Sequence, residues 1–238
     1  MSFGIIVQAR YNSTRFKGKI FHKIGRFPLL ELLILRLKKV KNTKIIIAAP
    51  LTEGIDTKRK FENLSRKHCV DVFYGSEKNV LKRYYDCSKF YKLKNIIRIT
   101  SDCPLSDPNI IKNSIKIFSK LNLDYLTNTL IPTYPDGLDV EIFNFKSLEK
   151  VIKNNPSKLT KEHVTHEFKI NDYFKKKNFS LNQDFSRSRL TVDYKDDLKI
   201  IRQIISKKGI YANFSKIKKY LIKNKNINNK YYRNTKFE

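Results

Sequence analysis

The sequence predicts an α/β fold built around a mostly parallel β-sheet with helices on both faces. Short apolar runs, each long enough for one strand, alternate in the first half of the chain with patterns long enough for a helix. This alternation is typical of βαβ units and a parallel sheet. The chain has 238 residues, 40% of them hydrophobic, which suits one α/β domain, or one domain with a small lobe.

The first half of the chain contains the clearest elements. Strands are predicted from mostly aliphatic runs at residues 3–9, 44–49, 70–73, 95–100 and 124–129. Helices are predicted between them, at residues 28–37, 56–68, 77–91 and from 107 onward. Pro28 and Pro108 stand near helix starts, and Asp107 is a suitable N-cap. Because right-handed crossovers bring the carboxyl ends of parallel strands to one edge, a ligand site is expected along that edge.

The alternation breaks after about residue 130. Residues 132–137 are rich in turn formers, and residues 139–143 alternate as a half-buried strand does. Further elements are predicted as helices at 147–153, 160–171 and 196–207 and a last strand at 189–193. We therefore predict one domain over residues 1–210, with about 130–190 forming a lobe. Residues 211–238 form a basic tail, expected to be a loosely packed amphipathic helix that frays.

The composition argues against several classes of protein. No apolar run approaches about 18 residues, so no transmembrane helix is expected. The short apolar run at the N-terminus has no basic region before it, and is interpreted as a strand and not a signal peptide. Cys69, Cys87 and Cys103 are odd in number and include no C-x-x-C pair, so neither a disulfide framework nor a zinc site is expected. A reducing cytoplasm is the predicted compartment.

The formal net charge of +28 admits two interpretations. A strongly basic chain often binds nucleic acid or another polyanion. Here the lysines are spread along the whole chain beside abundant Ile and Asn, whereas a binding footprint usually clusters. We attribute the charge to solvated surfaces and to local phosphate binding, and expect neither a nucleic-acid nor a membrane partner.

The first functional candidate is the loop after the first strand. It places three cations, Arg10, Arg15 and Lys19, close together, with the hydroxyls of Ser13 and Thr14 between them. A triphosphate needs fixed cations, backbone N–H groups and a helix N-terminus, and this loop precedes a predicted helix. The loop matches neither a Walker A motif nor a G-x-G-x-x-G fingerprint. The alternative is a solvated basic loop.

Two aspartates follow predicted strands. Asp102 comes just after residues 95–100, and Asp193 ends the run 189–193. Carboxylates at that edge could hold Mg²⁺, which binds through one or two carboxylates together with substrate phosphates. The alternatives are structural: Asp102 as a turn residue before Pro104, and Asp193 as the N-cap of the following helix.

Two further clusters carry polar groups. Residues 134–141 place acidic side chains on a turn and strand, which suits recognition of sugar hydroxyls, or equally a plain β-turn leading into a hairpin. His163 and His166 are three residues apart on a predicted helix face. One histidine pair lacks the three or four ligands that zinc requires, so we interpret His163 as a polar site or interface residue.

Taken together, these clusters form a family pattern. Residues 8–19 (Q-A-R-x-x-S-T-R-x-x-G-K), 98–105 (R-I-T-x-D-C-P-L), 134–141 (Y-P-D-G-L-D-V-E), 162–165 (E-H-V-T) and 190–193 (L-T-V-D) occur in the family order. The chain thereby resembles the cytidylyltransferases grouped with spore-coat polysaccharide biosynthesis proteins. It is similar, more distantly, to the CMP-Kdo and CMP-sialate synthetases. The motifs span residues 5 to about 206, so only the basic tail falls outside them.

The resemblance implies a nucleotide-diphospho-sugar transferase fold, Rossmann-like and GT-A-like, a homodimer and Mg²⁺. It implies that the lobe at about 130–190 serves the sugar and the dimer. The implied NTP-binding residues are Gln8, Ala9, Arg10, Ser13, Arg15, Lys19, Arg98 and Ser101. The implied sugar-binding residues are Tyr134, Asp136, Gly137, Asp139, Glu141 and His163. Asp102 and Asp193 are the implied metal ligands, and Lys19, Arg15 and Asp102 the implied catalytic residues.

Three departures from the family pattern are visible. Ser101 replaces a usual glycine, Arg26-Phe27 replaces Gly-Lys, and His166-Glu167 replaces Pro-Tyr. The implied reaction converts an NTP, expected to be CTP, and a sugar, expected to be a 2-keto-3-deoxy sugar acid, to CMP-sugar and pyrophosphate. Two other functions stay open: a metal-dependent glycosyltransferase of the same fold, for which Asp139-x-Glu141 is the nearest metal motif, and a non-catalytic polyanion-binding protein.

Overall fold

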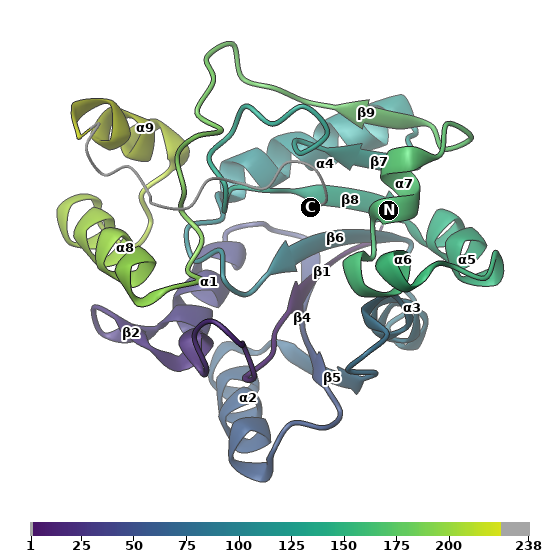
Figure 1. Ribbon diagram of the computed structural model, residues 1–238, viewed down its shortest axis with the longest axis horizontal. Helices are drawn as coiled ribbons and strands as arrows, with labels where there is room; N and C mark the ends of the chain where they lie inside the picture. Colours follow the sequence, from purple (N-terminus) through teal and green to yellow (C-terminus); the bar gives the residue numbers. More distant parts are fainter. Residues whose placement is uncertain (1, 225–238) are drawn as a thin grey trace.

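A seven-stranded sheet runs through the centre of the computed structural model, which describes residues 2–224 (Figure 1). In spatial order the strands are β5 (Asp71–Gly75), β4 (Thr43–Pro50), β1 (Phe3–Gln8), β6 (Asn95–Thr100), β8 (Glu141–Asn144), β7 (Tyr125–Thr127) and β9 (Lys176–Asn178). Within this sheet β8 is antiparallel to β6 and β7, and the other neighbouring pairs are parallel. The predicted mostly parallel α/β fold is confirmed.

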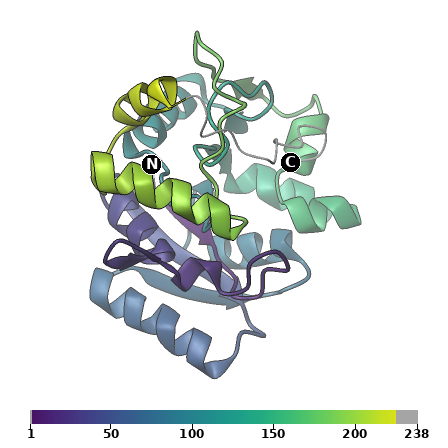
Figure 2. The same cartoon turned by 60° about the vertical axis from the view of Figure 1, so that its left-hand side comes forward.

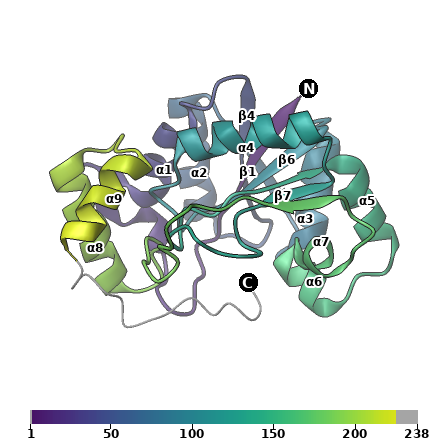
Figure 3. The ribbon, with the colours of Figure 1, turned by 90° about the horizontal axis from the view of Figure 1, so that it is seen from above.

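Helices cover both faces of the sheet. The larger core cluster receives side chains from α1 (Leu29–Leu37), α2 (Ile55–His68), α4 (Pro108–Leu121), α8 (Lys195–Lys208) and α9 (Phe214–Lys223). The second cluster receives them from α3 (Val80–Phe90), α5 (Phe145–Lys153) and α7 (His166–Ile170), and from Val164, which follows α6 (Lys158–His163). Strand β1 feeds both, since Ile5 and Val7 join the first cluster and Ile6 the second. Figure 3 shows α8 and α9 on the side of the molecule opposite α5, α6 and α7.

The register of the central strands places the candidate loops together. Gln8, the last residue of β1, lies opposite Ala48 of β4 on one side and Thr100 of β6 on the other. The loops that follow β1 and β6 therefore leave the sheet side by side, at the edge where ligands bind in open α/β sheets. Between β1 and α1 the chain forms a short 3₁₀ turn η1 (Lys19–Phe21) and a small hairpin of β2 (Lys23–Ile24) and β3 (Phe27–Pro28).

The single helix predicted over 160–171 is wrong, because the chain breaks it at Val164. This residue has a φ of 45°, a region that β-branched residues strongly disfavour, and its side chain is fully buried. The break separates α6 from α7 and turns the Thr165 hydroxyl toward Glu141, to which it donates a hydrogen bond of 2.7 Å. His163 and His166 therefore belong to different helices and not to one helix face.

The strand predicted over 189–193 is extended but pairs only locally. Leu190 N–H donates to the Asp136 carbonyl at 2.7 Å, and Val192 N–H donates to the Asp102 carbonyl at 2.9 Å. An isolated bridge joins Asp136 and Arg189, so this segment is no full member of the sheet. The seventh strand is instead β9, which the sequence analysis did not predict, because the polar run Lys176–Asn178 has no apolar pattern.

The C-terminal helix α9 is part of the core, contrary to the expected loose packing. Phe214, Ile217 and Tyr220 are buried in the larger cluster, and Figure 2 shows α9 stacked beside α8. Helix α1 is hydrogen-bonded to the same region. Its buried Arg36 guanidinium donates to the carbonyls of Leu105, Ser106, Ile210 and Ala212. The rest of the predicted tail, 225–238, lies outside the described residues. Within residues 2–224, the helices are too short or too polar to cross a bilayer.

Candidate active site

Two adjoining cavities open at the carboxyl edge of the sheet. The smaller, of about 170 Å³, is lined by the loop after β1 and the turn after β6. The larger, of about 480 Å³, continues from there toward β8 and α7. Arg15, Thr100, Asp102 and Asp193 line both cavities, so they mark the junction.

Lys19 joins the two predicted metal ligands. Its ammonium Nζ lies 2.9 Å from Asp102 Oδ2 and 2.8 Å from Asp193 Oδ1, and its side chain is only 8% exposed. The two carboxylates therefore meet although 91 positions separate them in the sequence, as the strand-end argument predicts. Burial alone would lower the pKa of Lys19, but the charges of Asp102 and Asp193 outweigh it and raise that pKa.

Asp102 is held as a carboxylate. Burial alone would raise its pKa, but the Lys19 charge and hydrogen bonds from Thr100 and Lys19 bring the pKa well below its usual range. The Cys103 thiol donates to its other oxygen, Oδ1, at 3.6 Å. Burial and the Asp102 charge raise the pKa of the Cys103 thiol, so the thiol keeps its proton for this bond.

Asp193 is not the cap of the helix that follows it. The N-cap of α8 is Tyr194, and the capping carboxylate is Asp197, whose Oδ2 accepts from the N–H groups of Asp193 and Tyr194 at 2.8 Å each. The Asp193 side chain is therefore directed to Lys19, Arg15 and Arg189. The structural alternative raised by the sequence is excluded for this residue.

Hydrogen bonds hold the backbone of the basic loop, and its Arg15 side chain is half exposed. Glu53 Oε1 accepts from Tyr11 N–H at 2.7 Å, and Gly18 N–H donates back to the Tyr11 carbonyl at 2.9 Å. Gly18 has a φ of 70°, and a Cβ there would lie 2.9 Å from the Tyr11 ring, so glycine is needed at this position. The Arg15 side chain is 51% exposed and contacts Asp193 Oδ1 at 2.9 Å.

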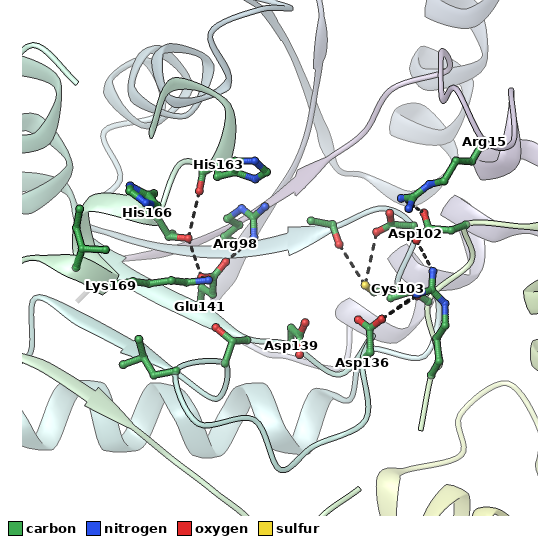
Figure 4. Close-up of a pocket in the computed structure, with 18 residues that line it drawn as sticks. Arg15, Arg98, Asp102, Cys103, Asp136, Asp139, Glu141, His163, His166 and Lys169 are labelled. Atoms are coloured by element: carbon green, nitrogen blue, oxygen red, sulfur yellow. Dashed lines mark hydrogen bonds and ion pairs between the residues drawn. The ribbon is translucent and has the colours of Figure 1, made fainter. Parts of the chain in front are cut away.

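The structure brings most of the implied NTP residues together. The smaller cavity is lined by Gln8, Arg10, Ser13, Arg15, Lys19 and Ser101. Ala9 is fully buried in the core and belongs to neither lining. Arg98 lies in the larger cavity beside Glu141 (Figure 4), away from the smaller one.

The turn at Asp136 closes one side of the larger cavity. Gly137 has a φ of 97°, and a Cβ there would lie 2.7 Å from the backbone of Leu190 and Thr191, so only glycine permits this approach. Asp136 and Asp139 line the cavity. Tyr134 packs instead against Phe179 and Phe214, so its side chain belongs to the core and not to the lining.

The far end of the larger cavity is built around Glu141. Arg98 forms an ion pair with Oε2, while Oε1 accepts from Tyr125 OH at 2.5 Å and from Thr165 at 2.7 Å. Lys169 Nζ lies 3.5 Å from the same oxygen. Burial alone would raise the pKa of Glu141, but the Lys169 and Arg98 charges and these hydrogen bonds lower it to about 2. Figure 4 shows this group and the Asp102 group at opposite ends, with Asp139 between them.

Several lining residues escaped the sequence analysis. His163, which it included, lines the cavity together with Thr165, His166 and Lys169. The most consequential omission is Arg189, which contacts Asp136, Asp193 and Asp197. Because residues 189–193 were predicted as a strand, a spacing of four residues places Arg189 and Asp193 on the same face, and this signal could have identified Arg189.

The fold is that of the nucleotide-diphospho-sugar transferases. A solved cytidylyltransferase from Leptospira borgpetersenii serovar Hardjo-bovis superimposes with a TM-score of 0.89 at 31% sequence identity. The superposition covers 98% of this chain and 99% of that one. The predicted fold family is therefore confirmed.

A family profile described as Cytidylyltransferase matches residues 4–236, and the chain belongs to this family. The uncharacterized protein MJ1063 of Methanocaldococcus jannaschii is 42% identical over 67% of this chain, an alignment that spans 64% of that protein, less than two thirds of it. The spore coat polysaccharide biosynthesis protein SpsF of Bacillus subtilis is 28% identical over 86% of each chain. The predicted family resemblance and nucleotidyltransferase class are confirmed.

Proposed function

We propose that the protein transfers a CMP group from CTP to a hydroxyl of a 2-keto-3-deoxy sugar acid, with Mg²⁺ as cofactor. The sugar oxygen forms a bond to the α-phosphorus as the bond to the β-phosphate oxygen breaks. The products are CMP-sugar, pyrophosphate and the hydroxyl proton, which leaves to solvent. The observation that carries the proposal is the junction of the two cavities, where Asp102, Asp193 and a basic loop converge.

The two carboxylates fit a divalent cation. Both contact a single cationic nitrogen, Lys19 Nζ, so their oxygens can be no further apart than the two contact distances combined. The Lys19 ammonium thus occupies the position that a divalent cation between the two carboxylates would take. Within residues 2–224 no group of three or more His, Cys, Asp or Glu side chains gathers to hold a metal. Two carboxylates are nevertheless enough for Mg²⁺, which completes its shell with phosphates and waters. When bound, Mg²⁺ neutralises charge on the phosphates and lowers the pKa of an oxygen that it contacts.

The protein's own side chains then perform binding and charge stabilisation. Arg10, Arg15 and Lys19 line the smaller cavity, where they can offset charge that grows on the pyrophosphate leaving group. Asp136 and Asp139 line the larger cavity and can accept hydrogen bonds from sugar hydroxyls. Phosphoryl transfer asks little covalent chemistry of a protein, so such positioning accounts for most of the expected rate gain.

The name of SpsF supports a role in surface polysaccharide biosynthesis. The glycosyltransferase alternative fares worse, because its nearest metal motif includes Glu141. That carboxylate is 4% exposed and contacted by Arg98, Tyr125, Thr165 and Lys169. The homodimer and the cytoplasmic location remain predictions.

The test is a pyrophosphate-release assay. The pure protein is incubated with each NTP in turn, Mg²⁺ and a panel of 2-keto-3-deoxy sugar acids. We expect release with CTP, dependent on both the acid and Mg²⁺, and little with ATP, GTP or UTP. A clear preference for another NTP would overturn the base assignment alone. No release with any combination would overturn the proposed substrates.

A further inference from the structure

The extended segment 188–193 arranges three polar side chains on one side. Arg189, Thr191 and Asp193 all line the larger cavity, whereas Leu190 and Val192 are fully buried in the core. This alternation is that of a β-strand, although the backbone N–H groups of Leu190 and Val192 donate to the turns at Asp136 and Asp102 and not to a strand of the sheet. The segment therefore holds Asp193 next to the turns that carry Asp102 and Asp136.

Arg189 is the fixed cation of this segment. Its side chain is 9% exposed, and its guanidinium contacts Asp193 Oδ2 in a short ion pair, Asp136 Oδ2 at 3.4 Å and Asp197 Oδ1 at 3.5 Å. A planar guanidinium directs its N–H donors in a fixed fork, whereas the three donors of an ammonium rotate. Asp197 is itself fixed, because it caps α8.

The two oxygens of Asp193 have partners of different kinds. Oδ2 contacts Arg189, which its other ion pairs hold in place. Oδ1 contacts Lys19 and Arg15, which also line the smaller cavity. The latter two can turn toward phosphates when a nucleotide enters, and this would leave Oδ1 free to contact another cation.

We propose that Arg189 is a positioning residue that anchors Asp193 Oδ2, so that Oδ1 is presented to the metal while the Asp136 turn is kept in register with it. The inference rests on the proposed function, since it assumes a divalent cation at the junction. It assigns Arg189 no contact with the reacting atoms. Its effect is transmitted through the orientation of Asp193 and Asp136.

The test compares Arg189→Met, Arg189→Lys and a matched control, Arg187→Met, which removes an exposed arginine two residues away. Mn²⁺ binding is measured by the electron paramagnetic resonance of the free ion, with CTP present and no sugar, and the Mn²⁺ that CTP binds without protein is subtracted. We expect both Arg189 variants to bind Mn²⁺ about 10- to 100-fold more weakly, the scale of losing a residue that orients a metal ligand. Arg187→Met should match the wild type.

The lysine variant separates orientation from charge. If Arg189 acted only through its charge, Arg189→Lys would bind Mn²⁺ like the wild type and Arg189→Met would bind it more tightly, because the site would become more negative. Either result would overturn the proposal. Thermal unfolding identifies a variant that fails to fold, and if Arg189→Met does so, Arg189→Lys decides alone.

Pyrophosphate release by the wild type separates this inference from the proposed function. Should the wild type bind Mn²⁺ and show the expected loss in the variants, yet release no pyrophosphate, the function fails and the inference stands. Turnover by the wild type with unchanged Mn²⁺ affinity in both variants leaves the function intact and sinks the inference. No Mn²⁺ binding by the wild type overturns the inference as well.

Discussion

The two ends of the larger cavity each contain a buried carboxylate, and they differ in how its partners are held. Glu141 is enclosed by Arg98, Tyr125, Thr165 and Lys169, which come from β6, β7 and the chain around α7. Asp193 shares one oxygen with Lys19 and with Arg15, whose side chain is half exposed. A carboxylate with a closed set of partners ties elements together, whereas one whose partners can leave is available for chemistry.

The largest expected effect is on stability at the Glu141 end. Glu141→Gln keeps the shape but removes the buried negative charge that Arg98 and Lys169 both contact. We expect a loss of about 3–5 kcal/mol in the free energy of unfolding, measured with urea, as for other broken buried pairs. The control is Glu149→Gln, which removes an exposed pair with Lys153 and should cost no more than about 1 kcal/mol. A Glu141→Gln protein as stable as the wild type would mean that the Glu141 carboxylate does not tie the surrounding elements together.

The next effect is on catalysis at the other end. Asp102→Asn and Asp193→Asn keep size and leave Lys19 one carboxylate, so both variants should fold. We expect kcat to fall by about 10²- to 10³-fold, the scale of losing a charge-stabilising group, with only partial recovery at high Mg²⁺. The control is Asp196→Asn, whose carboxylate is exposed and paired with Lys199. Full activity of Asp193→Asn at low Mg²⁺ would contradict the two-carboxylate site.

The smallest effect is the response of the Glu141 end to acid. The pKa of Glu141 is lowered to about 2 in the folded protein from an ordinary value of 4.5, so its contribution to stability is complete above the ordinary value and falls as the pH drops toward 2. The difference in unfolding free energy between wild type and Glu141→Gln should therefore shrink by about 2 kcal/mol between pH 7 and pH 3. A difference that stays constant over this range would mean that charge is not what holds the Glu141 end.

The sequence predicted the first half of the molecule better than the second. Strands β1, β4 and β6 are mostly aliphatic runs, and a parallel sheet brings their ends to one edge, so the loops that carry Lys19 and Asp102 could be placed together from pattern alone. The second half depends more on tertiary contacts. The break at Val164 accompanies the hydrogen bond of Thr165 to Glu141, and β9 pairs with β7, and neither contact leaves a periodic signal in the sequence.

The difference between periodic patterns and tertiary contacts also explains which site residues the sequence analysis missed or misplaced. Arg98 was assigned to the nucleotide through the family resemblance, but it lies two residues before the end of β6 and pairs across to Glu141 on β8. The sequence analysis included Tyr134 in the site and omitted Arg189 for a related reason. The direction of a side chain in a loop is set by what packs against it, here Phe179 and Phe214 for Tyr134 and Asp193 for Arg189.

The contacts of Arg36 bear on how the protein comes into existence. The chain leaves the ribosome with its N-terminus first, so the basic loop and Asp102 emerge long before Asp193. The buried guanidinium of Arg36 supports the carbonyls of Leu105 and Ser106, just beyond Asp102, but it also requires the carbonyls of Ile210 and Ala212. A nascent chain that stops before Asp193 contains Lys19 and Asp102 without the second carboxylate, and one that stops before Ile210 lacks two of the hydrogen-bond acceptors of Arg36. The surroundings of the site are therefore complete only once residues up to Ala212 have been translated.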